Sequence, residues 1–162
     1  MPKILDLQLK TSSLVLRLIV GLITAAVSFI LLYYIPANLS SLMYSFGIRD
    51  EIIINLVRSL VNPVLPTIGL AVAVLELVSA IMRGSKTYGP ITLVLGLLLT
   101  SYVYLLFQQG AIVIPLSASI YPGISGALVI QLTNLMLLFI LPFILMALKG
   151  ITLTYYSMRS SK

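Results

Sequence analysis

The chain of 162 residues contains no cysteine, no histidine and no tryptophan, and only 9% of its residues are charged. Without thiolate or imidazole groups, this chain alone can form no disulfide, zinc site, iron–sulfur cluster or histidine-ligated haem. We therefore predict no metal site and no covalently bound cofactor. Any redox cofactor would have to be carried by a partner or be bound without these ligands.

What the chain has instead is apolar surface. Hydrophobic residues make up 60% of it, and the mean hydropathy is +1.15, far outside the range of ordinary soluble domains. Its length suits four spanning helices of about 20 residues each with short connections. The predicted fold is an all-α integral membrane protein, an antiparallel bundle of four transmembrane helices in one membrane domain over residues 1–162.

The apolar runs place the four spans at about residues 14–35, 67–83, 90–107 and 124–148. A cleaved signal peptide is the competing reading of the first run, but about 22 residues exceed the usual apolar core, so an uncleaved anchor is favoured. We expect Met1 to Ser13 to be a short lead, with at most a short interfacial turn.

Two connections carry patterns of their own. Apolar residues within about 48–62 recur on one helical arc and polar residues on the other, which predicts a helix lying in the membrane surface. An outward extension of the second span, broken or kinked by Pro63 and Pro66, is the alternative. Residues 108–123 contain no charge but several prolines and glycines, so they are expected to lie against or dip into the interface.

The formal net charge of +6 comes from basic residues at the ends of these runs, not from a water-exposed basic face. This distribution argues against a nucleic-acid partner and indicates topology. With a cytoplasmic N-terminus, most lysines and arginines fall on the cytoplasmic side, so both termini are expected there, in a multi-pass protein of the cell membrane.

Glu76 is the single ionisable residue inside the second predicted span. Carboxyl groups at such depth normally face a partner, a cavity or a reaction. Arg17, about one turn inside the same boundary on the first helix, can reach Glu76 if the two helices are adjacent. The pair could be a structural ion pair that sets helix register, or Glu76 could be a proton or ligand site.

Gln131 and Asn134 are three residues apart on the fourth predicted helix and should share a face. Such amides commonly form hydrogen bonds between helices, and a role in binding a polar headgroup or a quinone carbonyl is the alternative. Gly21, Gly69 and Gly96 each begin a small-xxx-small pair, which predicts close helix contacts.

Two stretches of the chain resemble the DoxX/DoxD family of four-helix membrane proteins. They are LVLRLIVGLI, from Leu14 to Ile23, and AVLELVSAIMRGSKTYGPITLVLGLLL, from Ala73 to Leu99. The likeness covers about a third of the chain. It implies that Arg17 and Glu76 are the family's paired positions and that the role is a membrane subunit of a quinone-linked oxidoreductase.

Three functions stay open at this level. The first is a membrane subunit of a larger complex, with bound quinone as the expected small molecule and catalysis by this chain alone not expected. The second is a homo-oligomeric transporter or channel that uses Glu76, since four helices are too few to enclose a pore. The third is a structural or accessory scaffold. Lipid and other membrane subunits, or further copies of the chain, are the expected partners.

Overall fold

The computed structural model describes residues 2–116 and 126–159, with side chains from Leu14 onward except at positions 60, 115 and 116. The chain is mostly helical. In order, its elements are α1 (Pro2–Ser28), the π-helix η1 (Phe29–Tyr34), α2 (Ile35–Ala37), α3 (Leu39–Ser45), α4 (Glu51–Leu60), α5 (Leu65–Ile81), α6 (Tyr88–Leu106), the 3₁₀ turn η2 (Gln108–Gly110), β1 (Ala111–Leu116), β2 (Gly126–Gln131) and α7 (Thr133–Arg159).

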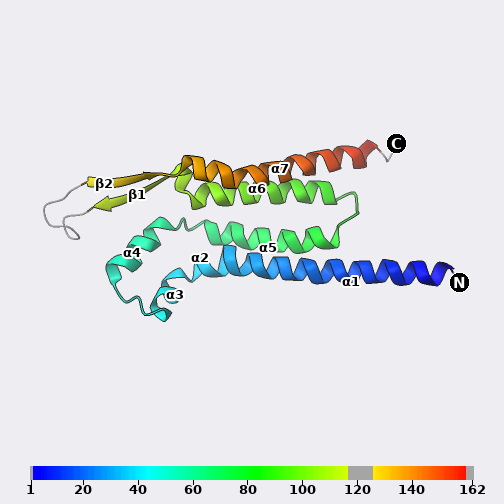
Figure 1. Cartoon of the computed structure of the whole chain (residues 1–162), viewed down its shortest axis with the longest axis horizontal. Coiled ribbons are helices and arrows are strands. Elements are labelled where there is room, and N and C mark those ends of the chain that lie inside the picture. The colour runs from blue at the N-terminus through cyan, green and yellow to red at the C-terminus, as the bar shows by residue number, and fades with distance from the viewer. Residues whose placement is uncertain (1, 117–125, 160–162) are drawn as a thin grey trace.

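Four long helices lie side by side in chain order, α1 against α5, α5 against α6, and α6 against α7 (Figure 1). Neighbours run antiparallel. Both ends of the chain lie at one end of this layer, together with the turn between α5 and α6, whereas α3, α4 and the β1–β2 ribbon lie at the other end. The short basic turn after α5, in which Gly84 takes a φ of +92°, makes α5 and α6 neighbours as the sequence predicts.

Three helical stretches in the described part of the chain are long and apolar enough to cross a membrane: Leu14–Ala37, Tyr88–Leu106 and Thr133–Arg159. They correspond to the first, third and fourth predicted spans. Leu65–Ile81 is equally apolar but has 17 residues, slightly short of the usual length. Its crossing of the membrane as a fourth span stays a prediction.

The first helix is longer than predicted at both ends. Its backbone is helical from Pro2, so residues 2–13 continue the helix instead of forming a separate lead. At the other end Pro36 does not end the helix, because η1 changes the hydrogen-bond spacing there and the Ile35 N–H donates to the Ile30 carbonyl. Pro36 then lies in the first turn of α2, where its missing N–H is tolerated.

The α6–α7 contact is tight and apolar. Gly96 lies so close to α7 that an added Cβ would stand 2.6 Å from the backbone nitrogen of Ala147. Farther along, Val103, Met136 and Ile140 form a buried cluster. This contact is the densest part of the molecule, and it confirms the predicted packing role of Gly96.

The α1–α5 contact also depends on glycine. A Cβ on Gly21 would collide with the Cβ of Ala80, and one on Gly69 would collide with the carbonyl of Leu32. The predicted packing roles of both glycines are confirmed. The Leu32 carbonyl also accepts a hydrogen bond of 3.2 Å from the Tyr102 hydroxyl of α6, so α5 and α6 both approach the first helix at this point.

Within the predicted surface segment, α4 begins at an N-cap, where the Asp50 carboxylate accepts hydrogen bonds from the N–H groups of Ile52 and Ile53. The chain leaves helical geometry at Val61 before α5 starts at Leu65. The two helices are therefore separated by a break before Pro66 and do not form one kinked helix. Whether α4 lies in the membrane surface stays a prediction.

The fourth predicted span, 124–148, is wrong at both ends. Residues 126–131 are strand β2, and the helix runs from Thr133 to Arg159. β2 pairs antiparallel with β1, from Ala111 opposite Gln131 to Leu116 opposite Gly126. Valine and isoleucine are frequent in both strands and favour extended backbone, and a short apolar run does not separate strand from helix. The 108–123 segment therefore contains a strand, and its last residues, like 124, lie outside the described part.

Candidate functional site

One face of α1 carries the only polar groups of its apolar stretch. Arg17, Gly21, Thr24 and Ser28 follow one another at spacings of four, three and four residues, which places them on one side of a helix. This side faces α5, since Gly21 is the buried member and lies against Ala80. The Thr24 hydroxyl donates to the carbonyls of Val20 and Gly21 in its own helix.

Glu76 projects from α5 toward this face and is partly buried. The Ser28 hydroxyl donates a hydrogen bond of 2.6 Å to its Oε2 atom. Hydrogen bonds from hydroxyl groups to carboxylates are short and strong. Ser28 is the one hydrogen-bond partner of the Glu76 side chain among the described residues, and it ties the C-terminal end of α1 to α5.

Arg17 has a different partner. Its Nη1 atom donates a hydrogen bond of 3.0 Å to the backbone carbonyl of Arg83, just beyond the end of α5. Arg83 follows Met82, the C-cap of α5, so Arg17 binds the start of the α5–α6 turn, where a cation also interacts favourably with the helix dipole. Glu76 is bonded to Ser28 instead.

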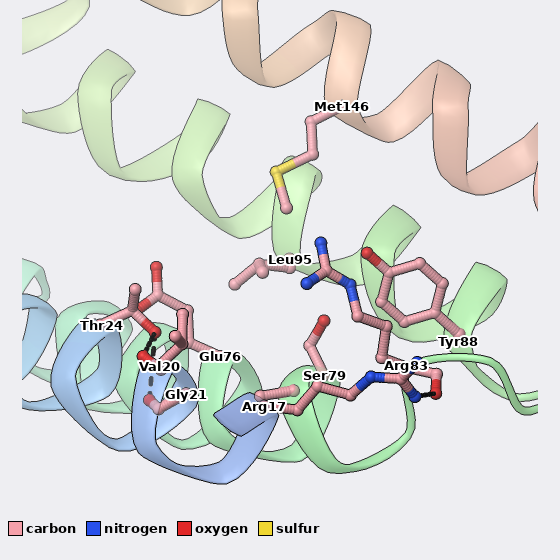
Figure 2. Close-up of a pocket in the computed structure, with 11 residues that line it drawn as sticks. Arg17, Val20, Gly21, Thr24, Glu76, Ser79, Arg83, Tyr88, Leu95 and Met146 are labelled. Carbon is pink, nitrogen blue, oxygen red and sulfur yellow. Dashed lines mark hydrogen bonds between the residues drawn. The ribbon is translucent and has the colours of Figure 1, made fainter. Parts of the chain in front are cut away.

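The two residues nevertheless border one cavity of about 220 Å³. Its walls come from all four long helices, with Arg17 and Thr24 from α1, Glu76 from α5, Leu95 from α6 and Met146 from α7. Figure 2 shows Glu76 and Thr24 at one end of this cavity, with Leu95 and Met146 above its middle. The adjacency of α1 and α5, on which a meeting of Arg17 and Glu76 depended, is therefore present. The structure brings the two residues to one cavity but gives them separate partners.

The other end of the cavity is basic. Arg83 extends its guanidinium group into it beside the ring of Tyr88, while Ser79 lies between this end and Glu76 (Figure 2). No hydrogen bond joins the Arg83 guanidinium to any residue of the described ranges 2–116 and 126–159. The cavity therefore has a carboxyl group at one end and a guanidinium group with free donors at the other.

The predicted amide pair is not part of this site. Gln131 is the last residue of β2, opposite Ala111, whereas Asn134 lies in the first turn of α7. Both side chains are exposed. They do not share a helix face, because the chain changes from strand to helix between them. Thr133 makes the contact there, since its hydroxyl donates to the Gly110 carbonyl over 3.3 Å.

Three residues of the observed network are absent from the sequence prediction: Ser28, Arg83 and Tyr102. The spacing from Arg17 to Ser28 is a usable signal, because these polar and small residues recur on one side of the stretch from Leu14 to Ser28, which is otherwise apolar. No comparable signal points to Tyr102, whose partner is a backbone carbonyl 70 residues away in the chain.

Comparison of this chain with protein-family models, with curated proteins and with solved structures found no match. The resemblance to the DoxX/DoxD family stays a prediction.

Proposed function

We propose that this protein is a four-span membrane subunit of a larger, quinone-linked complex in which Glu76 is the group that contacts the quinone. One observation supports the proposal above others: Glu76 borders a cavity between the four helices, and its side chain has a single hydroxyl partner, Ser28, among the described residues. Oε1 is then available to a small molecule. An ionisable group within the apolar part of a membrane protein is a functional candidate for this reason.

A quinone suits the cavity in both of its redox forms. A carboxyl group that carries a proton donates a hydrogen bond to a quinone carbonyl, and one that has lost its proton accepts from a quinol hydroxyl. Leu95 and Met146 offer apolar contact to the ring. Because the chain has no cysteine or histidine to hold a redox centre, the electrons would come from a partner subunit.

The first test is to purify the tagged protein from its native membrane in mild detergent and to identify what is bound to it. A stoichiometric subunit carrying flavin, haem or iron–sulfur chemistry is the expected result. The protein without any partner, or in a homo-oligomer, would contradict the complex.

The second test examines Glu76 itself by measuring quinone-dependent turnover of the purified complex and the binding of a short-chain ubiquinone analogue. Glu76→Gln keeps the shape and should leave assembly intact while lowering turnover about a hundredfold, the usual worth of a positioned acid–base group. Ser28→Ala should lower it severalfold. Glu51→Gln, an exposed change on α4 outside the cavity, is the matched control and should behave like the native chain. Unchanged turnover in Glu76→Gln would rule out the role of this carboxyl group.

A homo-oligomeric transporter or channel is the second candidate, and the exposure of α1 favours it. All side chains from Leu14 to Val20 are exposed, so one long helix offers an uncovered surface to further copies of the chain. If purification returns a pure homo-oligomer, ion flux in liposomes becomes the measurement, with Glu76→Gln as the variant expected to abolish it.

A further inference from the structure

The basic end of the cavity contains arginine side chains that have no part in the proposed binding of a quinone. Arg83 directs its guanidinium group into the cavity, between Tyr88 and Leu95 (Figure 2). This group has no hydrogen-bond partner among the described residues. A guanidinium carries five N–H donors in a planar fork, so an arginine in this position has unused capacity for an anion.

Arg17 strengthens the same end. One of its N–H groups is fixed on the Arg83 carbonyl, and this bond holds the Arg17 guanidinium at the end of α5. The remaining donors of Arg17 stay close to the turn, near Gly84, whose added Cβ would lie 3.8 Å from Arg17 Nη1. Two guanidinium groups therefore border one end of a single cavity.

The carboxyl group is not paired with either arginine, since Glu76 is bonded to Ser28 and Arg17 to the Arg83 carbonyl. Along the chain Glu76 precedes Arg83 by seven residues, roughly 10 Å along a helix axis. Val20, Leu95 and Met146 make part of the cavity wall apolar. The cavity thus has two guanidinium groups at one end and apolar side chains along part of its walls, an arrangement that suits an amphipathic anion.

The basic end of the cavity lies at the end of the molecule where α1 begins, α7 ends and the chain turns from α5 into α6 (Figure 1). Arg83, Lys86 and Arg159 belong to this end. The charge distribution in the sequence predicts that it is the cytoplasmic end. Positive residues collect on the cytoplasmic side of membrane proteins, where anionic phospholipids are also abundant. Basic pockets between spanning helices on that side bind phosphate headgroups.

We propose that Arg83 and Arg17 bind the phosphate group of an anionic phospholipid, with an acyl chain of that lipid lying along Val20, Leu95 and Met146. Arginine suits this role because its fork matches two phosphate oxygens at once. This site goes beyond the proposed function and does not rest on it, since it requires no quinone and no partner subunit.

The test uses the full chain in detergent and counts bound lipid by native mass spectrometry during titration with phosphatidylglycerol. Arg83→Gln should weaken binding about tenfold, the loss expected for a charge-assisted contact. The fold should be kept, because only the Arg83 backbone carbonyl has a partner among the described residues. Arg83→Lys, which keeps the charge but loses the fork, should bind with intermediate affinity.

Arg159→Gln is the matched control, since it removes the same charge from the same end of the molecule, outside the cavity. It should bind phosphatidylglycerol like the native chain. Equal weakening by Arg159→Gln and Arg83→Gln would overturn the proposal in favour of general charge attraction. Equally tight binding of phosphatidylcholine, which has no net charge, would overturn it as well.

A second titration, with inorganic phosphate, separates the two sources of the anion. Phosphate should displace phosphatidylglycerol only weakly, because it gains nothing from the apolar walls. If phosphate alone binds as tightly as the lipid and Arg83→Gln abolishes both, the lipid assignment is wrong and the site is one for soluble phosphate.

Discussion

The two helix pairs of this protein are held together by different means. The α6–α7 pair packs glycine against backbone and buries an apolar cluster of Val103, Met136 and Ile140. The α1–α5 pair also uses glycine but adds the Ser28–Glu76 and Arg17–Arg83 hydrogen bonds. The α6–α7 contact is thus formed by close apolar packing, whereas the α1–α5 contact leaves polar groups beside a cavity.

Exposure sets the first helix apart from the others. In an apolar 18-residue segment of Leu14–Ala37, 6% of the residues are buried inside the molecule, against 33% in such a segment of Tyr88–Leu106. In lipid there is no hydrophobic drive to bring helices together, so pairs are held by close packing and by hydrogen bonds. The α6–α7 pair therefore serves mainly the stability of the fold, whereas the α1–α5 pair carries polar groups of the candidate site.

The largest effect is expected from Gly96→Ala in the α6–α7 contact. The new Cβ would stand 2.6 Å from the Ala147 nitrogen and 2.8 Å from the Phe143 carbonyl, and backbone atoms cannot move aside as a side chain can. We expect a loss of about 3 kcal/mol in the free energy of unfolding, measured by denaturation in mixed detergent micelles. Gly126→Ala meets nothing within 4 Å and should change it by less than about 0.5 kcal/mol.

A smaller loss of stability, which a second substitution should restore, is expected in the α1–α5 contact. Gly21→Ala would bring a methyl group against the side chain of Ala80, not against backbone. The single change should cost about 1–2 kcal/mol, and adding Ala80→Gly should restore most of the loss, because one methyl group is then exchanged for another. Strictly additive losses in the double variant would show that the two residues are not in contact.

The smallest effect concerns the link between the two halves. Tyr102→Phe removes the hydroxyl that donates to the Leu32 carbonyl without changing the ring. Loss of one such bond should cost about 1 kcal/mol in the same assay. Tyr104→Phe on the exposed side of the same helix is the control and should have almost no effect. Equal losses of unfolding free energy in Tyr102→Phe and Tyr104→Phe would show that the hydrogen bond to the Leu32 carbonyl does not stabilise the fold.

The two helix pairs and the β1–β2 ribbon also differ in how far the sequence alone predicts them. The α6 span, the α5–α6 turn and the α4 helix follow from apolar length, glycine placement and amphipathic pattern, all of which are local. The strands β1 and β2 do not, since the apolar run 126–131 reads as a helix start until its pairing partner is known. Gln131 was misplaced for this reason.

For the candidate site, the sequence by itself determined that Glu76 lies within an apolar helix and that Arg17 lies within the preceding apolar run. The expected place of Arg17 near a helix end was wrong, because α1 begins at Pro2. Only the tertiary structure decided their partners: Ser28 for Glu76, and the Arg83 carbonyl for Arg17. The physical reason is that hydrophobic length depends on residues adjacent in the chain. A hydrogen-bond partner depends instead on how two helices are rotated and shifted against each other, and the close contacts at Gly21 and Gly69 set that fit.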